Sequence, residues 1–203
     1  MLKSLLERIT SDSMLHAKWL NTLSYMENCG ARKISRYEHS NPIDIIVLKH
    51  AAEEHRHAFY LKKMIDRVQQ GACTYYTVEE MLGGYSSTQY LPKLDIFAAR
   101  YLKSALGLEG NDLKQAAYLL VTYAIEMRAD ELYPEYHAIL KRIKSKVSVY
   151  NIIKEEEGHL REMIAGLEAG LPNWEEHAHK ILAYESELFN EWLKELESEV
   201  MLN

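Results

Sequence analysis

Glycine, proline and cysteine are all scarce in this sequence of 203 residues. Nine glycines and four prolines are too few for the many tight turns of a β-rich fold, and the composition is not that of a disordered chain. The two cysteines, Cys29 and Cys73, provide neither a disulfide framework nor a CxxC metal knuckle. We therefore expect a globular protein of the reducing cytoplasm.

The chain also lacks an excess of positive charge and a long apolar run. Its 24 basic residues are outnumbered by 30 acidic ones, and the formal net charge is −6, so no electrostatic surface for nucleic acid is expected. The longest strongly apolar run, Ala116 to Ile125, has ten residues and is too short to cross a bilayer. Glu7 interrupts what would be the apolar region of a signal peptide. We expect neither nucleic acid nor a membrane as a partner.

Apolar residues repeat at the helical period throughout the chain, and no strand-like alternation extends beyond a few residues. Ser11 or Asp12 and the pair Asn41-Pro42 are start signals for helices. Pro134 predicts a kink or break inside a helix. Together with the glycine stop signals, these residues predict four long helices, at about 11–30, 42–70, 112–143 and 148–169.

A long connection, residues 73–110, joins the second and third of these helices and contains a shorter helix from about Lys93 to Leu106. Short links make the first and second helices, and the third and fourth, antiparallel neighbours, whereas the long link lets the second and third run parallel. Asn173 opens a further helix at about 173–200. We predict one all-α domain over residues 1–203, a four-helix bundle with an extra C-terminal helix.

Each of the four long helices carries one glutamate on its apolar face. Residues three, four or seven positions apart share a face of a helix, and this spacing places four acids among apolar residues: Glu27, Glu54, Glu126 and Glu156. Burying one unpaired carboxylate costs several kcal/mol or forces it to take up a proton. Four carboxylates in one core therefore need a countercharge, which two divalent ions would supply.

Two of these glutamates have a histidine three residues later, in Glu54-x-x-His57 and Glu156-x-x-His159. Positions i and i+3 are neighbours on a helix, so each pair can chelate one ion. The interval from Glu27 to Glu54 is 27 residues and that from Glu126 to Glu156 is 30, so the same half-motif occurs twice. Carboxylate and imidazole ligands suit iron or manganese, although zinc is also compatible.

This pattern resembles that of the ferritin-like di-iron carboxylate superfamily, over about residues 11–70 and 112–169. The resemblance implies a ferritin-like bundle that binds two iron ions, with manganese or a mixed manganese–iron pair as alternatives. It implies that Glu27 and Glu126 are single-carboxylate ligands, that Glu54 and Glu156 bridge or chelate, and that His57 and His159 are the nitrogen ligands.

Other polar residues near these motifs have more than one interpretation. His50, one turn before Glu54, could be an extra ligand or a donor to one, although a surface or core histidine is the commoner case. Tyr123 and Asp130, each one turn from Glu126, are candidates for contacts to the ligands, but core packing for the tyrosine and solvation for the aspartate compete with that role. We expect solvated positions for Glu53, Glu155, Glu157, His177 and His179.

Three functions fit this pattern, and the sequence names no catalytic residue. We favour an oxidase or oxygenase that uses O2 or peroxide on a small organic substrate, because residues 73–110 and 173–200 could cover a channel. Iron or peroxide handling, as in ferritins and rubrerythrins, is an alternative, although Ala129 stands where rubrerythrins have a further glutamate. The third function is a non-catalytic metal-binding bundle. No nucleotide, flavin or haem motif is visible, so electrons would come from a separate donor, and a homodimer is compatible with the sequence.

Overall fold

The computed structural model describes residues 1–38 and 44–202, and within these ranges the chain is helical and contains no strand. This confirms the all-α prediction. The helices and their bounds are α1 Leu2–Ser11, α2 Ser13–Glu38, α3 Ile45–Val68, the short 3-10 helix η1 Val78–Glu80, α4 Gly84–Leu106, α5 Gly110–Arg142, α6 Tyr150–Gly170 and α7 Trp174–Leu202.

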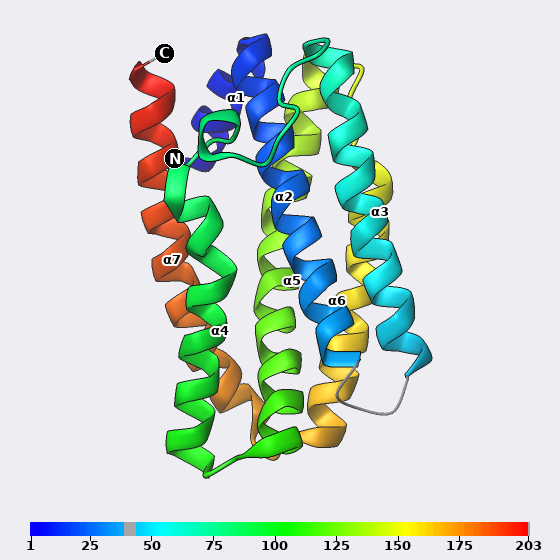
Figure 1. Cartoon of the computed structure of the whole chain (residues 1–203), viewed down its shortest axis with the longest axis vertical. Coiled ribbons are helices and arrows are strands. Elements are labelled where there is room, and N and C mark those ends of the chain that lie inside the picture. The colour runs from blue at the N-terminus through cyan, green and yellow to red at the C-terminus, as the bar shows by residue number, and fades with distance from the viewer. Residues whose placement is uncertain (39–43, 203) are drawn as a thin grey trace.

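Four helices, α2, α3, α5 and α6, form the bundle that carries the six predicted ligands. The helices α2 and α3 pack closely as an antiparallel pair, and α5 and α6 form a second such pair. In Figure 1, α3 and α5 run in the same direction. The helix α4, which comes between them in the chain, runs back along the length of the molecule. The parallel arrangement expected from the long connection is therefore present.

The helices α4 and α7 form a further layer beside α5, and α1 covers one end of the bundle against α2, α5 and α7. The buried residues of α7 recur at helical spacing, as at Ile181, Leu188 and Trp192. The indole rings of Trp192 and Trp19 stack with centroids 5.6 Å apart, so α7 is packed against α2 as part of the same core. None of the described helices is long and apolar enough to cross a membrane.

The starts of α2 and α3 follow the expected capping chemistry. The Asp12 carboxylate accepts hydrogen bonds from the backbone amides of Met14 and Leu15, at 2.8 and 2.9 Å, and so caps α2 as predicted. Asp44 caps α3 in the same way. The predicted start at Asn41-Pro42 lies outside the described residues.

Several helix bounds differ from the sequence prediction. The helix α2 does not end at Gly30 but runs to Glu38, since Ala31 and Ile34 continue its buried face. The helix α4 begins at Gly84 rather than near Lys93 and contains Pro92. The helix α5 continues through Pro134 without the break we considered, with buried tyrosines on both sides of the proline, Tyr133 and Tyr136. Tertiary packing outweighs these local signals.

Candidate metal centre

The six predicted ligands meet in the middle of the bundle. Two overlapping groups of side chains each have ligand atoms that all lie within 4.8 Å of one another. Glu54 belongs to both groups, and all members except the half-buried Glu27 are buried. The groups are Glu27, Glu54, His57 and Glu156 in one case, and His50, Glu54, Glu126 and His159 in the other.

Glu156 lies between the two histidines of the paired motifs. Its Oε1 is 3.0 Å from His57 Nδ1, and its Oε2 is 2.8 Å from His159 Nδ1. Glu54 Oε1 is 3.3 Å from His159 Nδ1 and 4.0 Å from His57 Nδ1. Each of these two carboxylates therefore faces both imidazoles, as a bridging ligand between two ions would.

The outward nitrogen of each histidine contacts a second carboxylate from the opposite helix. His57 Nε2 donates to Glu155 at 2.7 Å, and His159 Nε2 donates to Glu53 at 2.8 Å. Glu155 belongs to α6 and Glu53 to α3, so each of these two helices provides the carboxylate that accepts a hydrogen bond from the histidine of the other helix. Our expectation that these two glutamates are simply solvated is wrong, whereas the more exposed Glu157 pairs with a lysine at the surface. These outer bonds fix which nitrogen of each ring points inward.

One buried atom of the centre is left without a hydrogen bond. His57 Nδ1 is inaccessible and has no hydrogen-bond partner, although three carboxylates lie within 4.0 Å of it. An inward lone pair surrounded by carboxylates is the environment of a metal-ligating imidazole. The oxygen and nitrogen donors, with no thiolate among them, fit iron or manganese.

Burial and mutual repulsion control protonation in this cluster. Burial raises the pKa of Glu27 and of Glu126 well above the ordinary value, and the charges of Glu54 and Glu156 raise them further. Burial also opposes ionisation of Glu54, but hydrogen bonds from His159 and His50 outweigh it and hold the Glu54 pKa well below its usual range. Without an ion, part of the cluster must therefore carry protons.

The same carboxylate charges favour the protonated, positively charged form of the two histidines. Burial lowers the pKa of His159, but hydrogen bonds and charges from Glu156 and Glu54 outweigh burial and raise it to about 10. The pKa of His57 is also raised, because contacts with Glu156 outweigh burial. The cluster attracts positive charge, whether protons or metal cations.

The two halves of the centre are not equivalent, and His50 is the main difference. This residue is fully buried, and its Nε2 lies 3.0 Å from Glu126 and 3.5 Å from Glu54, so it is a core histidine inside the metal-binding group and not a surface residue. The position that corresponds to His50 in the second motif, four residues before Glu156, is occupied by Ile152. One group thus offers two imidazoles and the other offers one.

Tyr133 supplies a second difference between the halves. Its buried hydroxyl donates to the carboxylate of Glu27. Glu126, the counterpart of Glu27, is instead 3.0 Å from His50. Tyr133 lies seven residues after Glu126 on α5 and was not singled out from the sequence as a contact to the ligands.

The other candidates from the sequence lie away from the cluster. Asp130 is exposed and is absent from both metal-binding groups in the described chain. Tyr123 packs edge-on against Trp174 of α7, with centroids 5.6 Å apart. Spacing alone suggested both, but α5 turns these side chains toward solvent and α7. His179 is exposed as expected, whereas His177 is buried and within 2.8 Å of a tyrosine hydroxyl, contrary to expectation.

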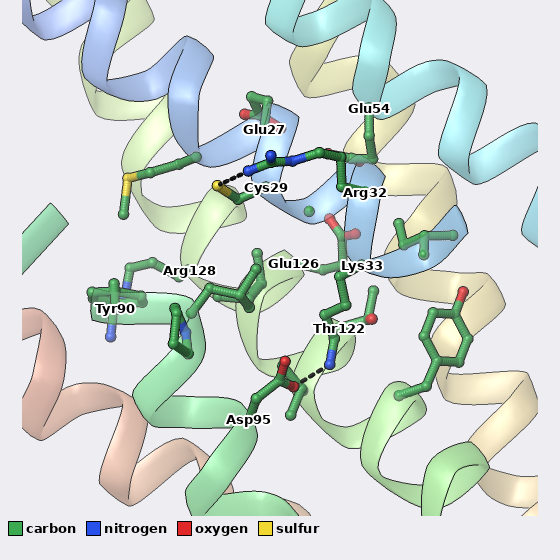
Figure 2. Close-up of a pocket in the computed structure, with 18 of the residues that line it drawn as sticks. Glu27, Cys29, Arg32, Lys33, Glu54, Tyr90, Asp95, Thr122, Glu126 and Arg128 are labelled. Carbon is green, nitrogen blue, oxygen red and sulfur yellow. Dashed lines mark hydrogen bonds and ion pairs between the residues drawn. The ribbon is translucent and has the colours of Figure 1, made fainter. Parts of the chain in front are cut away.

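A large cavity reaches the cluster from the side of α4. It encloses about 990 Å³ and is lined by residues of α2, α4, α5 and α7 and by Glu54 of α3. The carboxylates of Glu27, Glu54 and Glu126 lie on its wall, as does Gly30. In Figure 2, an ion pair between Lys33 of α2 and Asp95 of α4 spans the same cavity. A cavity of this volume is at the upper end of the range for small-molecule sites.

Comparison of the chain with protein-family models, with curated proteins and with solved structures found no match.

Proposed function

We propose that the protein is a ferritin-like dinuclear metal carboxylate protein whose two ions are iron, and that it is an oxidase or oxygenase acting on a small organic substrate. The arrangement that supports the two-ion site is the pair of overlapping groups that share Glu54. Four carboxylates balance the charge of two divalent cations, and either manganese or a manganese–iron pair would satisfy the same donors.

His57, His159 and the four glutamates would hold the ions, with His50 as a third nitrogen ligand at the Glu126 side. Iron bound there would supply redox chemistry with O2 or peroxide. The protein contributes the positioning: Glu155 and Glu53 fix the two inner imidazoles through hydrogen bonds. Tyr133 donates a hydrogen bond to the Glu27 carboxylate, and the mostly apolar cavity borders the cluster.

The cavity is the observation that favours an organic substrate over iron storage. It lies between α2 and α5 of the bundle and α4, which belongs to the predicted insert, with Phe189 and Trp192 of α7 completing the wall. Three of the ligand glutamates line it. Storage or transit of iron ions does not require an apolar chamber of about 990 Å³. Electrons would come from a separate donor protein, because the chain shows no binding motif for an organic redox cofactor.

Metal analysis of the purified protein tests the site itself. We expect two ions per chain, and Glu54→Ala or Glu156→Ala should reduce this number while the protein stays folded. Glu157→Ala is the matched control, because Glu157 is adjacent to Glu156 but partly exposed and paired with Lys154. Failure to bind any ion at any loading would disprove the proposal.

Oxygen consumption tests the catalytic part. The reduced, iron-loaded protein should consume O2 faster than buffer containing the same iron, and Glu54→Ala should abolish the difference. Rapid reaction with peroxide together with a large cage in light scattering would instead indicate iron handling. Inertness to both oxidants, with a lower melting temperature after metal removal, would indicate a non-catalytic bundle.

A further inference from the structure

The cavity beside the metal centre is elongated. Its lining residues on α5 extend from Leu113 to Tyr133, a separation of 20 residues that corresponds to about 30 Å of helix. Glu126 lies within this stretch, and a rounded small molecule would leave much of the space empty. The shape fits an extended ligand that lies along α5 and passes the carboxylates.

Most of the wall is apolar. Between the ends, α5 contributes Ala117 and Val121, α4 contributes Leu91 and Ala99, and α2 contributes Ile34. At the end toward α7, Arg128 is neutralised by the buried Glu185, with two hydrogen bonds of 2.7 and 2.8 Å, and its guanidinium lies over the Phe189 ring at 3.8 Å. That end therefore presents no unpaired arginine charge to a ligand.

The other end carries two positively charged side chains. Arg36 of α2 and Lys114 of α5 line the cavity there and are both exposed. Neither forms an ion pair with any residue in the described ranges, whereas Lys33 nearby is already paired with Asp95. The second half of α2 and the first half of α5 lie at the same, lower end of the bundle in Figure 1.

We propose that the substrate is an amphipathic carboxylate: a long apolar chain in the cavity with its anionic head between Arg36 and Lys114. The twelve residues from Lys114 to Glu126 on α5 separate the head from the ligand carboxylates by about 18 Å, so the apolar chain and not the head lies beside the metal centre. That this molecule is a substrate depends on the proposed function, whereas its binding does not.

The inference is tested by the binding of three ligands that share a ten-carbon alkyl chain and differ in the charge of the head group: decanoate, decanol and decylammonium. Titration calorimetry should be performed on the full-length protein as purified and again after treatment with a chelator, because decanoate could also bind a metal ion directly. We expect decanoate to bind about tenfold more tightly than decanol, as two partly exposed charge contacts would produce, and decylammonium to bind least.

Two variants locate the ligand. The double change Arg36→Gln and Lys114→Gln should make decanoate and decanol equal, and it involves exposed side chains that do not hold the fold. Lys141→Gln is the matched control, since Lys141 is exposed and outside the cavity. Ala117→Phe should weaken the binding of both ligands by narrowing the cavity about one helical turn inside the charged end.

Equal affinities for decanoate and decanol in the wild-type protein, or a preference for decylammonium, would overturn the inference. So would a decanoate preference that survives the double change. Decanoate binding to a protein that takes up no metal would refute the proposed function and leave this inference intact. Two bound metal ions with no decanoate binding would refute this inference and leave the proposed metal centre intact.

Discussion

Three mid-helix glycines provide a graded test of how tightly the metal centre is packed. A Cβ atom added at Gly30 of α2 would lie 3.7 Å from Glu54 Oε2, which is ordinary van der Waals contact. At Gly158 of α6 it would meet nothing within 4 Å, and at Gly166 it would come within 2.9 Å of a methyl carbon of Leu119. The space beside Gly158 is therefore open.

Alanine in a helix interior is more favourable than glycine by about 1 kcal/mol. Gly30→Ala and Gly158→Ala should both obtain this gain, because neither creates a clash. For a protein of this size, such a gain raises the melting temperature by about 2–4 °C. Gly166→Ala should lose the gain or reverse it, because the buried side chain of Leu119 must move.

Leucine at the same positions separates stability from metal binding. Gly30→Leu would place further carbons where the Glu54 carboxylate lies, so we expect metal uptake to fall, whereas Gly158→Leu should bind metal like the wild type. Thermal unfolding and metal analysis of the five variants measure both effects. A loss of metal binding in Gly30→Ala, or equal metal binding in the two leucine variants, would refute the packing that we describe around Glu54.

Three further predictions concern charge. The double change Glu53→Gln and Glu155→Gln should weaken metal binding about 10–100-fold in a competition titration; unchanged affinity would show that these bonds do not orient the histidines. Metal affinity should rise with pH, with protons released in calorimetry, because the raised pKa values of Glu27 and Glu126 keep protons that the ions must displace; pH-independent binding would contradict this. Burial lowers the pKa of His16 from 6.5 to about 4, so neutral His16 is compatible with the fold above pH 6.5 and stability is lost as the pH falls toward 4. At about pH 5 this loss is about 2 kcal/mol of unfolding free energy, and denaturant titration should show a weaker pH dependence in His16→Gln.

The sequence predicted the helical architecture well because its signals are local. Periodicity and caps such as Asp12 depend on residues within one or two turns. The misplaced bounds at Gly30 and near Pro92, and the break considered at Pro134, have the same origin, since each of these residues weakens an isolated helix by an amount that contacts with other helices can offset. Such contacts cannot be read from one segment.

The site residues illustrate the same limit. Spacing found the Glu-x-x-His pairs because each pair lies on one helix, but His50 contacts Glu126, 76 residues away. Tyr123 had suitable spacing and faces α7 instead. A signal for Glu53 and Glu155 was present: each directly precedes the glutamate of a motif, so that the chain repeats Glu-Glu-x-x-His. Only the packing of α3 on α6 shows that each of these two glutamates accepts a hydrogen bond from the histidine of the other motif.

The division of the ligands between two helix pairs has a consequence for how the protein folds. Within each antiparallel pair the contacts are local in sequence and can form early, whereas the two pairs make fewer contacts with each other and share the acidic centre. The pair α2–α3 supplies Glu27 and Glu54, and the pair α5–α6 supplies Glu126 and Glu156. Docking of the two hairpins must bring like charges together, so this step is opposed until cations or protons arrive. We therefore expect the concentration of free metal to set the rate of the last folding step, and newly made chains in metal-poor conditions to wait as two formed but separate hairpins.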